Sequence, residues 1–116
     1  MPRISIDYAV MEQAEHVLVV EAPFQWDDVG SWPAWARYRP ADEHDNRIDA
    51  PRHLEINADG NVVRSTEPGV VVVLAGVRDL VVIVTPDAVL VANKHDEASI
   101  AAVTEELRKR GWEEHL

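Results

Sequence analysis

The stretch GVVVVLAGVRDLVVIVTPDAVLVANK, residues 69–94, carries the clearest fold signal in the chain. It contains three short runs of β-branched and aliphatic residues, at 70–74, 80–84 and 88–91. Runs of this kind predict β-strands, and the Thr85-Pro86-Asp87 segment predicts a turn between the last two. Because each run is nearly all apolar, we expect both faces of these strands to be covered.

The residues before this stretch add a hairpin signal and a linker. In HLEINADGNVVR, residues 53–64, Asp59-Gly60 lies between two alternating runs, which is typical of a β-hairpin. Residues 39–52 are rich in charged and turn-forming residues, so we expect residues 41–52 to form an exposed linker.

A helix is predicted after the strands, near the end of the chain. Asp96 can cap it, and Gly111 can end it. Ile100, Val103 and Leu107 recur at helical spacing and are expected to form its buried face. Residues 53–116 are therefore predicted to form a β-rich domain with a terminal helix.

The first forty residues predict a helix, a strand and a second helix. Ser5 can cap a short helix over residues 6–14. The segment HVLVVEA is dense in aliphatic residues and favours a buried strand over residues 17–22. SWPAWARY, residues 31–38, favours a short helix with Ser31 as its cap.

The composition limits what the chain can bind. It has 116 residues, enough for one domain or part of one, and a net charge of -10. This charge argues against a nucleic-acid partner, which requires clustered Lys and Arg. No apolar run is long enough for a membrane span. The first eight residues lack the apolar core of a signal peptide, so a cytoplasmic location is expected.

The segment FQWDDVGSW, residues 24–32, is the candidate site. Two adjacent aspartates, a glycine and two tryptophans are consistent with an acidic turn pinned by its aromatic rings. They are also consistent with a magnesium site, because Mg²⁺ is usually held by one or two protein carboxylates, waters and substrate phosphates. Spacing does not choose between Asp27 and Asp28. The five glycines are isolated from one another, so this chain is not expected to form a glycine-rich phosphate-binding loop.

Two segments resemble paired motifs of the bacterial mannose-1-phosphate guanylyltransferases, also called GDP-mannose pyrophosphorylases. They are SIDYAVMEQA, residues 5–14, and FQWDDVGSW, residues 24–32. A third segment, VRDLVVIVTPDAVLVANK, residues 77–94, is similar to the family's closing strand region. The resemblance implies an α+β chain. Residues 1–40 would be a helix-strand-helix tail of the nucleotidyltransferase domain, and residues 53–116 a small domain like a left-handed β-helix with a C-terminal helix.

The resemblance also assigns site residues. The family's metal-binding aspartate falls on Asp28, which implies Mg²⁺ as cofactor. Asp27 occupies a position where the family usually has Ser, and Gln25 replaces a usual Gly. Asp7 lies in a motif close to the family's sugar-phosphate pocket and is the expected substrate-binding residue. No residue of this chain is assigned as catalytic.

The implied reaction converts GTP and mannose-1-phosphate to GDP-mannose and pyrophosphate. In the family the nucleotide-binding half precedes the SIDYAVMEQA motif, so the expected partner is that half or a second copy of this chain, and activity is expected only with that half. Two alternatives stay open. The chain is a non-catalytic binding or oligomerisation module, or it belongs to a related nucleotidyltransferase that uses another sugar or base.

Overall fold

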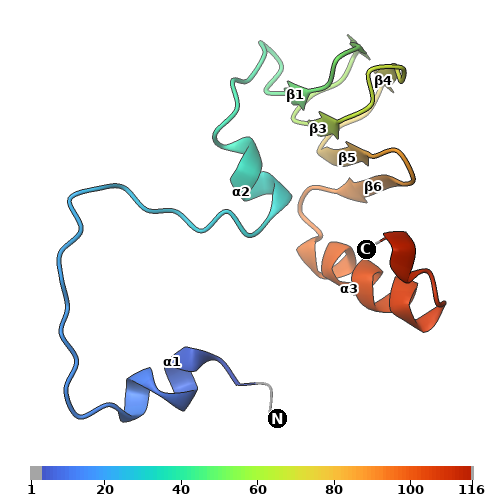
Figure 1. The fold of residues 1–116 in the computed structure, drawn as a ribbon. Helices are drawn as coiled ribbons and strands as arrows, with labels where there is room; N and C mark the ends of the chain where they lie inside the picture. The colour runs from blue at the N-terminus through green and yellow to red at the C-terminus, as the bar shows by residue number, and fades with distance from the viewer. Residues whose placement is uncertain (1–3, 116) are drawn as a thin grey trace.

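The computed structural model describes residues 4–115, so residues 1–3 of the N-terminal stretch discussed above lie outside it. Figure 1 shows a β-rich body, a C-terminal helix beside it and a long N-terminal arm. The elements are α1 (Ile6–Ala9), η1 (Met11–Gln13), α2 (Trp32–Ala36), β1 (Arg47–Asp49), β2 (His53–Ile56), β3 (Val62–Ser65), β4 (Val72–Ala75), β5 (Leu80–Val84), β6 (Val89–Asn93), α3 (Glu97–Lys109) and η2 (Glu113–His115). The predicted α+β class is confirmed.

The β-rich body is a short β-helix built from stacked coils. Strands β1, β3 and β5 are parallel neighbours in one sheet, to which β6 adds at the edge, and β2 and β4 form a second parallel sheet. The chain thus alternates between two sheets as it climbs. Only β5 and β6 pair antiparallel, around the turn predicted at residues 85–87.

The predicted hairpin at Asp59-Gly60 is wrong. Strands β2 and β3 flank this dipeptide but lie in different sheets, each paired with the next coil instead of with the other. Asn57 and Gly60 both have left-handed backbone, with φ of 51° and 67°. Two such corners, separated by a short connection, carry the chain across from one sheet to the other, whereas a hairpin turn reverses it in one step.

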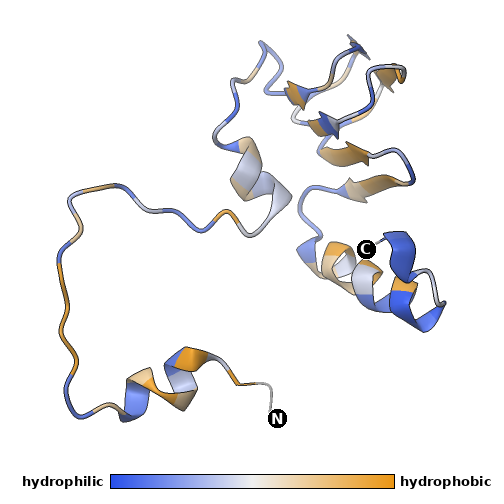
Figure 2. Ribbon diagram, in the orientation of Figure 1, coloured by the Kyte–Doolittle hydropathy of each residue, from blue (hydrophilic) through white to orange (hydrophobic). Residues whose placement is uncertain are grey.

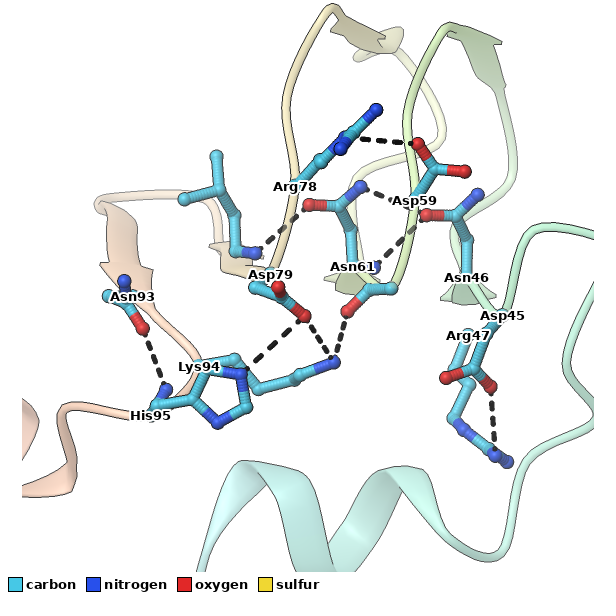
Figure 3. A network of polar contacts seen from close by, with 12 residues as sticks. Asp45, Asn46, Arg47, Asp59, Asn61, Arg78, Asp79, Asn93, Lys94 and His95 are labelled. Carbon is cyan, nitrogen blue, oxygen red and sulfur yellow. Dashed lines mark hydrogen bonds and ion pairs between the residues drawn. The ribbon is translucent and has the colours of Figure 1, made fainter.

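Two buried asparagines join the coils (Figure 3). The Asn46 side chain donates to the Ala58 carbonyl at 2.8 Å, and its oxygen accepts from both the backbone and the side chain of Asn61. The Asn61 oxygen in turn accepts from the Leu80 amide at 2.9 Å. Each asparagine therefore bonds to the residue stacked above it, and this aligns the three coils.

The residues expected to form an exposed linker belong to the β-helix. Strand β1 lies within residues 41–52, and Asn46 is 1% exposed. The charged side chains that suggested a linker are used in pairing, since Arg47 bonds to Asp45 and to two carbonyl groups of the α2 region. Composition alone gave the wrong prediction because these charges face outward while the backbone pairs with β3.

The expectation that all three apolar runs are covered on both faces holds only for β5. One face of β3 and β5 lines the interior of the β-helix, and the other carries Val62, Val81 and Ile83, which pack against Ala36 of α2. Strand β4 alternates between buried and exposed residues, and β6 has no fully buried residue. Helix α2 is short, so it covers only part of the sheet.

Helix α3 begins and ends as predicted. The Asp96 carboxylate accepts from the Ser99 amide at 3.0 Å, and Gly111 follows the helix with φ of 73°. Its apolar face is only partly covered, however, because Val103 remains 39% exposed. No helix within residues 4–115 is long and apolar enough to cross a membrane.

The N-terminal arm stands away from the body (Figure 1). Ser5 caps α1 as predicted, but the helix changes to a single 3₁₀ turn at Met11–Gln13. Residues 17–22 form no strand, and the apolar stretch is open to solvent (Figure 2), with Leu18 90% and Val19 86% exposed. A strand needs a neighbour for its backbone groups, and none of residues 4–115 provides one here. The radius of gyration is 18.6 Å, whereas a compact domain of this length has about 13 Å.

This exposed stretch predicts self-association of the isolated chain. Unpaired backbone beside aliphatic side chains favours pairing with another molecule. We expect light scattering at tens of micromolar to show a dimer or larger species. Leu18→Lys with Val20→Lys should shift the population to monomer, while the same change at the exposed polar residues Glu12 and Gln13 should not. A monomeric parent chain would contradict this prediction.

Candidate functional site

The FQWDDVGSW segment lies between the arm and α2. The Ser31 hydroxyl accepts from the Ala34 amide at 3.3 Å, and Pro33 occupies the first turn of α2. Both features fix the start of the helix, as the sequence predicted. Because Ala36 packs against β3 and β5, the end of this segment is anchored to the β-helix.

The two aspartates of the segment have different surroundings. Both oxygens of Asp27 accept from the Arg37 guanidinium, at 3.0 and 2.8 Å, and one accepts from the Tyr38 hydroxyl at 2.8 Å. The hydrogen bond from Arg37, reinforced by that from Tyr38, lowers the pKa of Asp27 below its usual value. Asp27 is therefore an ionised carboxylate whose charge is matched within the chain.

Asp28 faces no such partner. Within the described part of the chain its carboxylate makes no hydrogen bond or ion pair. It lies beside Gly30, where an added Cβ would sit 3.4 Å from an Asp28 oxygen. An uncommitted carboxylate next to a residue without a side chain fits a hard cation such as Mg²⁺ as one ligand. No group of three or more His, Asp or Glu residues among residues 4–115 is arranged to hold a metal alone, so a metal bound at Asp28 would need further ligands from elsewhere.

A hollow of about 460 Å³ opens beside this segment. It is lined by Val29, Gly30, Trp32 and Trp35 from the segment and α2, and by the first turns of α3. The Trp32 and Trp35 rings meet edge to face, with centroids 5.9 Å apart, and the Arg39 guanidinium lies 4.8 Å from the Trp35 centroid. These contacts give the hollow an ordered, largely apolar wall.

Comparison with known proteins identifies the family. Residues 51–107 match the family described as MannoseP isomerase/GMP-like beta-helix domain. The mannose-1-phosphate guanylyltransferase of Salmonella montevideo is 37% identical over 99% of this chain and 24% of its own length. That of Escherichia coli K12 is 35% identical over 98% of this chain and 23% of its own length. A solved structure from Thermus thermophilus, described as a mannose-1-phosphate geranyltransferase, has a TM-score of 0.73 and 41% identity, covering 93% of this chain and 32% of that one.

The chain corresponds to the C-terminal portion of the mannose-1-phosphate guanylyltransferase family. It spans about a quarter of the length of these curated relatives. The β-helix expected from the resemblance is confirmed by the family match and by the stacked parallel coils.

The other residue that the guanylyltransferase resemblance assigned is not near Asp28 in this structure. Asp7 lies on α1, at the far end of the arm from the FQWDDVGSW segment (Figure 1). The side chain is exposed, and α1 packs only against η1 among the described elements. The role of Asp7 in substrate binding stays a prediction.

Sequence reasoning missed Arg37 and Tyr38 as members of the site. They lie ten and eleven residues after Asp27, a spacing that matches no motif, and only the folded structure brings them to it across α2. The available signal was the extra carboxylate at a position where guanylyltransferases usually have Ser.

Proposed function

We propose that this chain acts as the C-terminal portion of an enzyme that converts GTP and mannose-1-phosphate to GDP-mannose and pyrophosphate. The observation that carries the proposal is the contrast between the two aspartates. Asp28, the residue at the metal-ligand position of the resemblance, is the one without a protein partner among the described residues, while the carboxylate beside it is matched by Arg37. The structure thus leaves available the carboxylate that the resemblance assigns to the metal, and not its neighbour.

In this proposal Asp28 supplies one of the oxygen ligands of Mg²⁺. When bound, the ion would neutralise the negative charge that develops on the transferring phosphate. The rest of the chain holds Asp28 in place, because catalysis of nucleotidyl transfer depends mainly on positioning. Helix α2 connects the segment to the rigid β-helix through Ala36, Val62 and Val81.

The partner in this proposal is the nucleotide-binding half that makes up most of the length of the relatives. The aliphatic residues 17–22 would there become a strand, since they are apolar on both faces and lack a neighbour among the described residues. Residues 1–40 would accordingly belong to the catalytic domain and residues 53–116 to the β-rich domain. The first coil, which starts within the expected linker, joins them. A cytoplasmic location, where GTP is available, completes the proposal.

The experiment is reconstitution. The purified chain should release no pyrophosphate above background from GTP and mannose-1-phosphate, because its described residues offer only one uncommitted carboxylate at the segment and no phosphate-binding loop. Fusion to the nucleotide-binding portion of a relative should restore release that depends on Mg²⁺ and on mannose-1-phosphate. Release by the chain alone would show that the site is complete without a partner. A folded but inactive fusion would favour the non-catalytic module.

A further inference from the structure

The Asp27 carboxylate stands one residue from the proposed metal ligand, at a position where an additional negative charge would compete for the cation. The chain carries a net charge of -10, so it has no excess of positive charge to offset a second free carboxylate here. Cation affinity in oxygen sites rises with the number of charged ligands. Two free carboxylates side by side would therefore bind a divalent cation differently from one.

The Asp27 carboxylate has partners within the chain. Arg37 binds both oxygens of Asp27 and leaves neither of them free of a hydrogen bond, and Tyr38 adds a bond to one oxygen. Both Arg37 bonds come from one guanidinium nitrogen, Nη2, so the contact offsets the charge of the carboxylate without the paired two-nitrogen geometry. The carboxylate of Asp27 is thereby held towards the end of α2.

Arg37 has no other carboxylate that competes for it among the described residues. The hollow beside it contains Asp45, Arg47 and Lys94. Asp45 pairs with Arg47 at 3.2 Å, and Lys94 pairs with Asp79 at 2.9 Å. The neighbouring cations and anions are thus matched to one another, and Arg37 is matched to Asp27.

We propose that Arg37 and Tyr38 sequester the Asp27 carboxylate, so that Asp28 is the only anionic ligand this segment offers to a divalent cation. Arg37 and Tyr38 are positioning residues in this view. The inference rests on the proposed role of Asp28, and it explains how this chain accommodates an aspartate where its family usually has Ser. It predicts that the change in cation affinity on replacing Arg37 depends on the presence of Asp27.

The test measures Mn²⁺ binding by electron paramagnetic resonance in the fusion of this chain with the nucleotide-binding portion of a relative, which supplies the further ligands. Broadening of the Val29 and Gly30 amide NMR signals locates the ion. Arg37→Met should tighten binding at the segment roughly tenfold, because a second charged ligand becomes free. Tyr38→Phe should give a smaller gain, since Arg37 still holds both oxygens. Arg37→Lys, which keeps the charge, should remain close to the parent.

The decisive variant combines Asp27→Ser with Arg37→Met, and it should return to the parent affinity. Asp27→Ser alone should bind no more tightly than the parent, because it leaves the Arg37 charge unmatched beside Asp28. If Arg37 only pinned the loop, then Asp27→Ser would behave like Arg37→Met and would not reverse it. The matched control is Arg39→Met, which removes the same charge two residues away, where Asp49 still has Arg64 as partner.

Unchanged Mn²⁺ affinity in Arg37→Met, or tighter binding that Asp27→Ser fails to reverse, would overturn the inference. The readout is metal binding without substrates and involves no turnover. A failure here is therefore distinguishable from a failure of the proposed function, which the reconstituted enzyme tests.

Discussion

Asp28→Asn should lower pyrophosphate release in the reconstituted enzyme by about a hundredfold or more, since a lost metal ligand removes several kcal/mol of transition-state charge stabilisation. The substitution keeps the size of the side chain and removes its charge. Asp28 makes no hydrogen bond or ion pair with the other described residues, so the fold should not change. The loss would therefore report on the missing ligand.

The matched control for this substitution is Asp27→Ser. It removes the adjacent carboxylate and restores the residue that the family usually has, and turnover should stay near that of the parent. A steady-state assay at increasing Mg²⁺ adds a second readout, because Asp28→Asn should require more Mg²⁺ for half-maximal rate. Equal effects of the two substitutions, or a rate indifferent to Asp28→Asn, would leave an acidic turn as the better description of this segment.

Asn61→Ala should produce the largest loss of stability, about 3 kcal/mol in the free energy of unfolding. The side chain is fully buried, and it bonds to Asn46, to the Val77 carbonyl and to the Leu80 amide. Alanine leaves these groups without partners between stacked coils, where water has little access. Such a loss is a large share of the stability of a small domain.

Urea unfolding followed by far-UV circular dichroism measures this effect. The control is Asn93→Ala, which removes one exposed hydrogen bond to the His95 amide and should cost about 1 kcal/mol or less. A similar midpoint for the two variants would show that the asparagine stack does not hold the coils together.

The candidate site was only partly visible in the sequence. The motif resemblance selected Asp28, and the structure leaves this carboxylate without a hydrogen bond or ion pair among the described residues; its role as a metal ligand stays a prediction. The Arg37 and Tyr38 contacts to Asp27 could not be read, because they depend on how α2 is oriented by Ala36 against the β-helix. The pairing of Asp7 with the site stays a prediction, since α1 lies apart from it here.

The sequence alone determined the local features. The Ser31 and Asp96 caps, the limits of β5 and the turn after it follow from residues within a few positions of one another, and caps act over that range. Residues 17–22 predict a strand locally but form none here, because a strand also needs a neighbour to complete its hydrogen bonds.

Only the tertiary structure decided how the strands stack. A dipeptide such as Asp59-Gly60 favours a hairpin locally, yet in the fold β2 pairs with β4, and β3 lies between β1 and β5. The matched positions Asn46, Asn61 and Leu80 are separated by 15 and then 19 residues, so no fixed period reveals the coils. Their alignment comes from buried asparagine side chains and apolar packing between residues far apart in sequence, which local preferences do not encode.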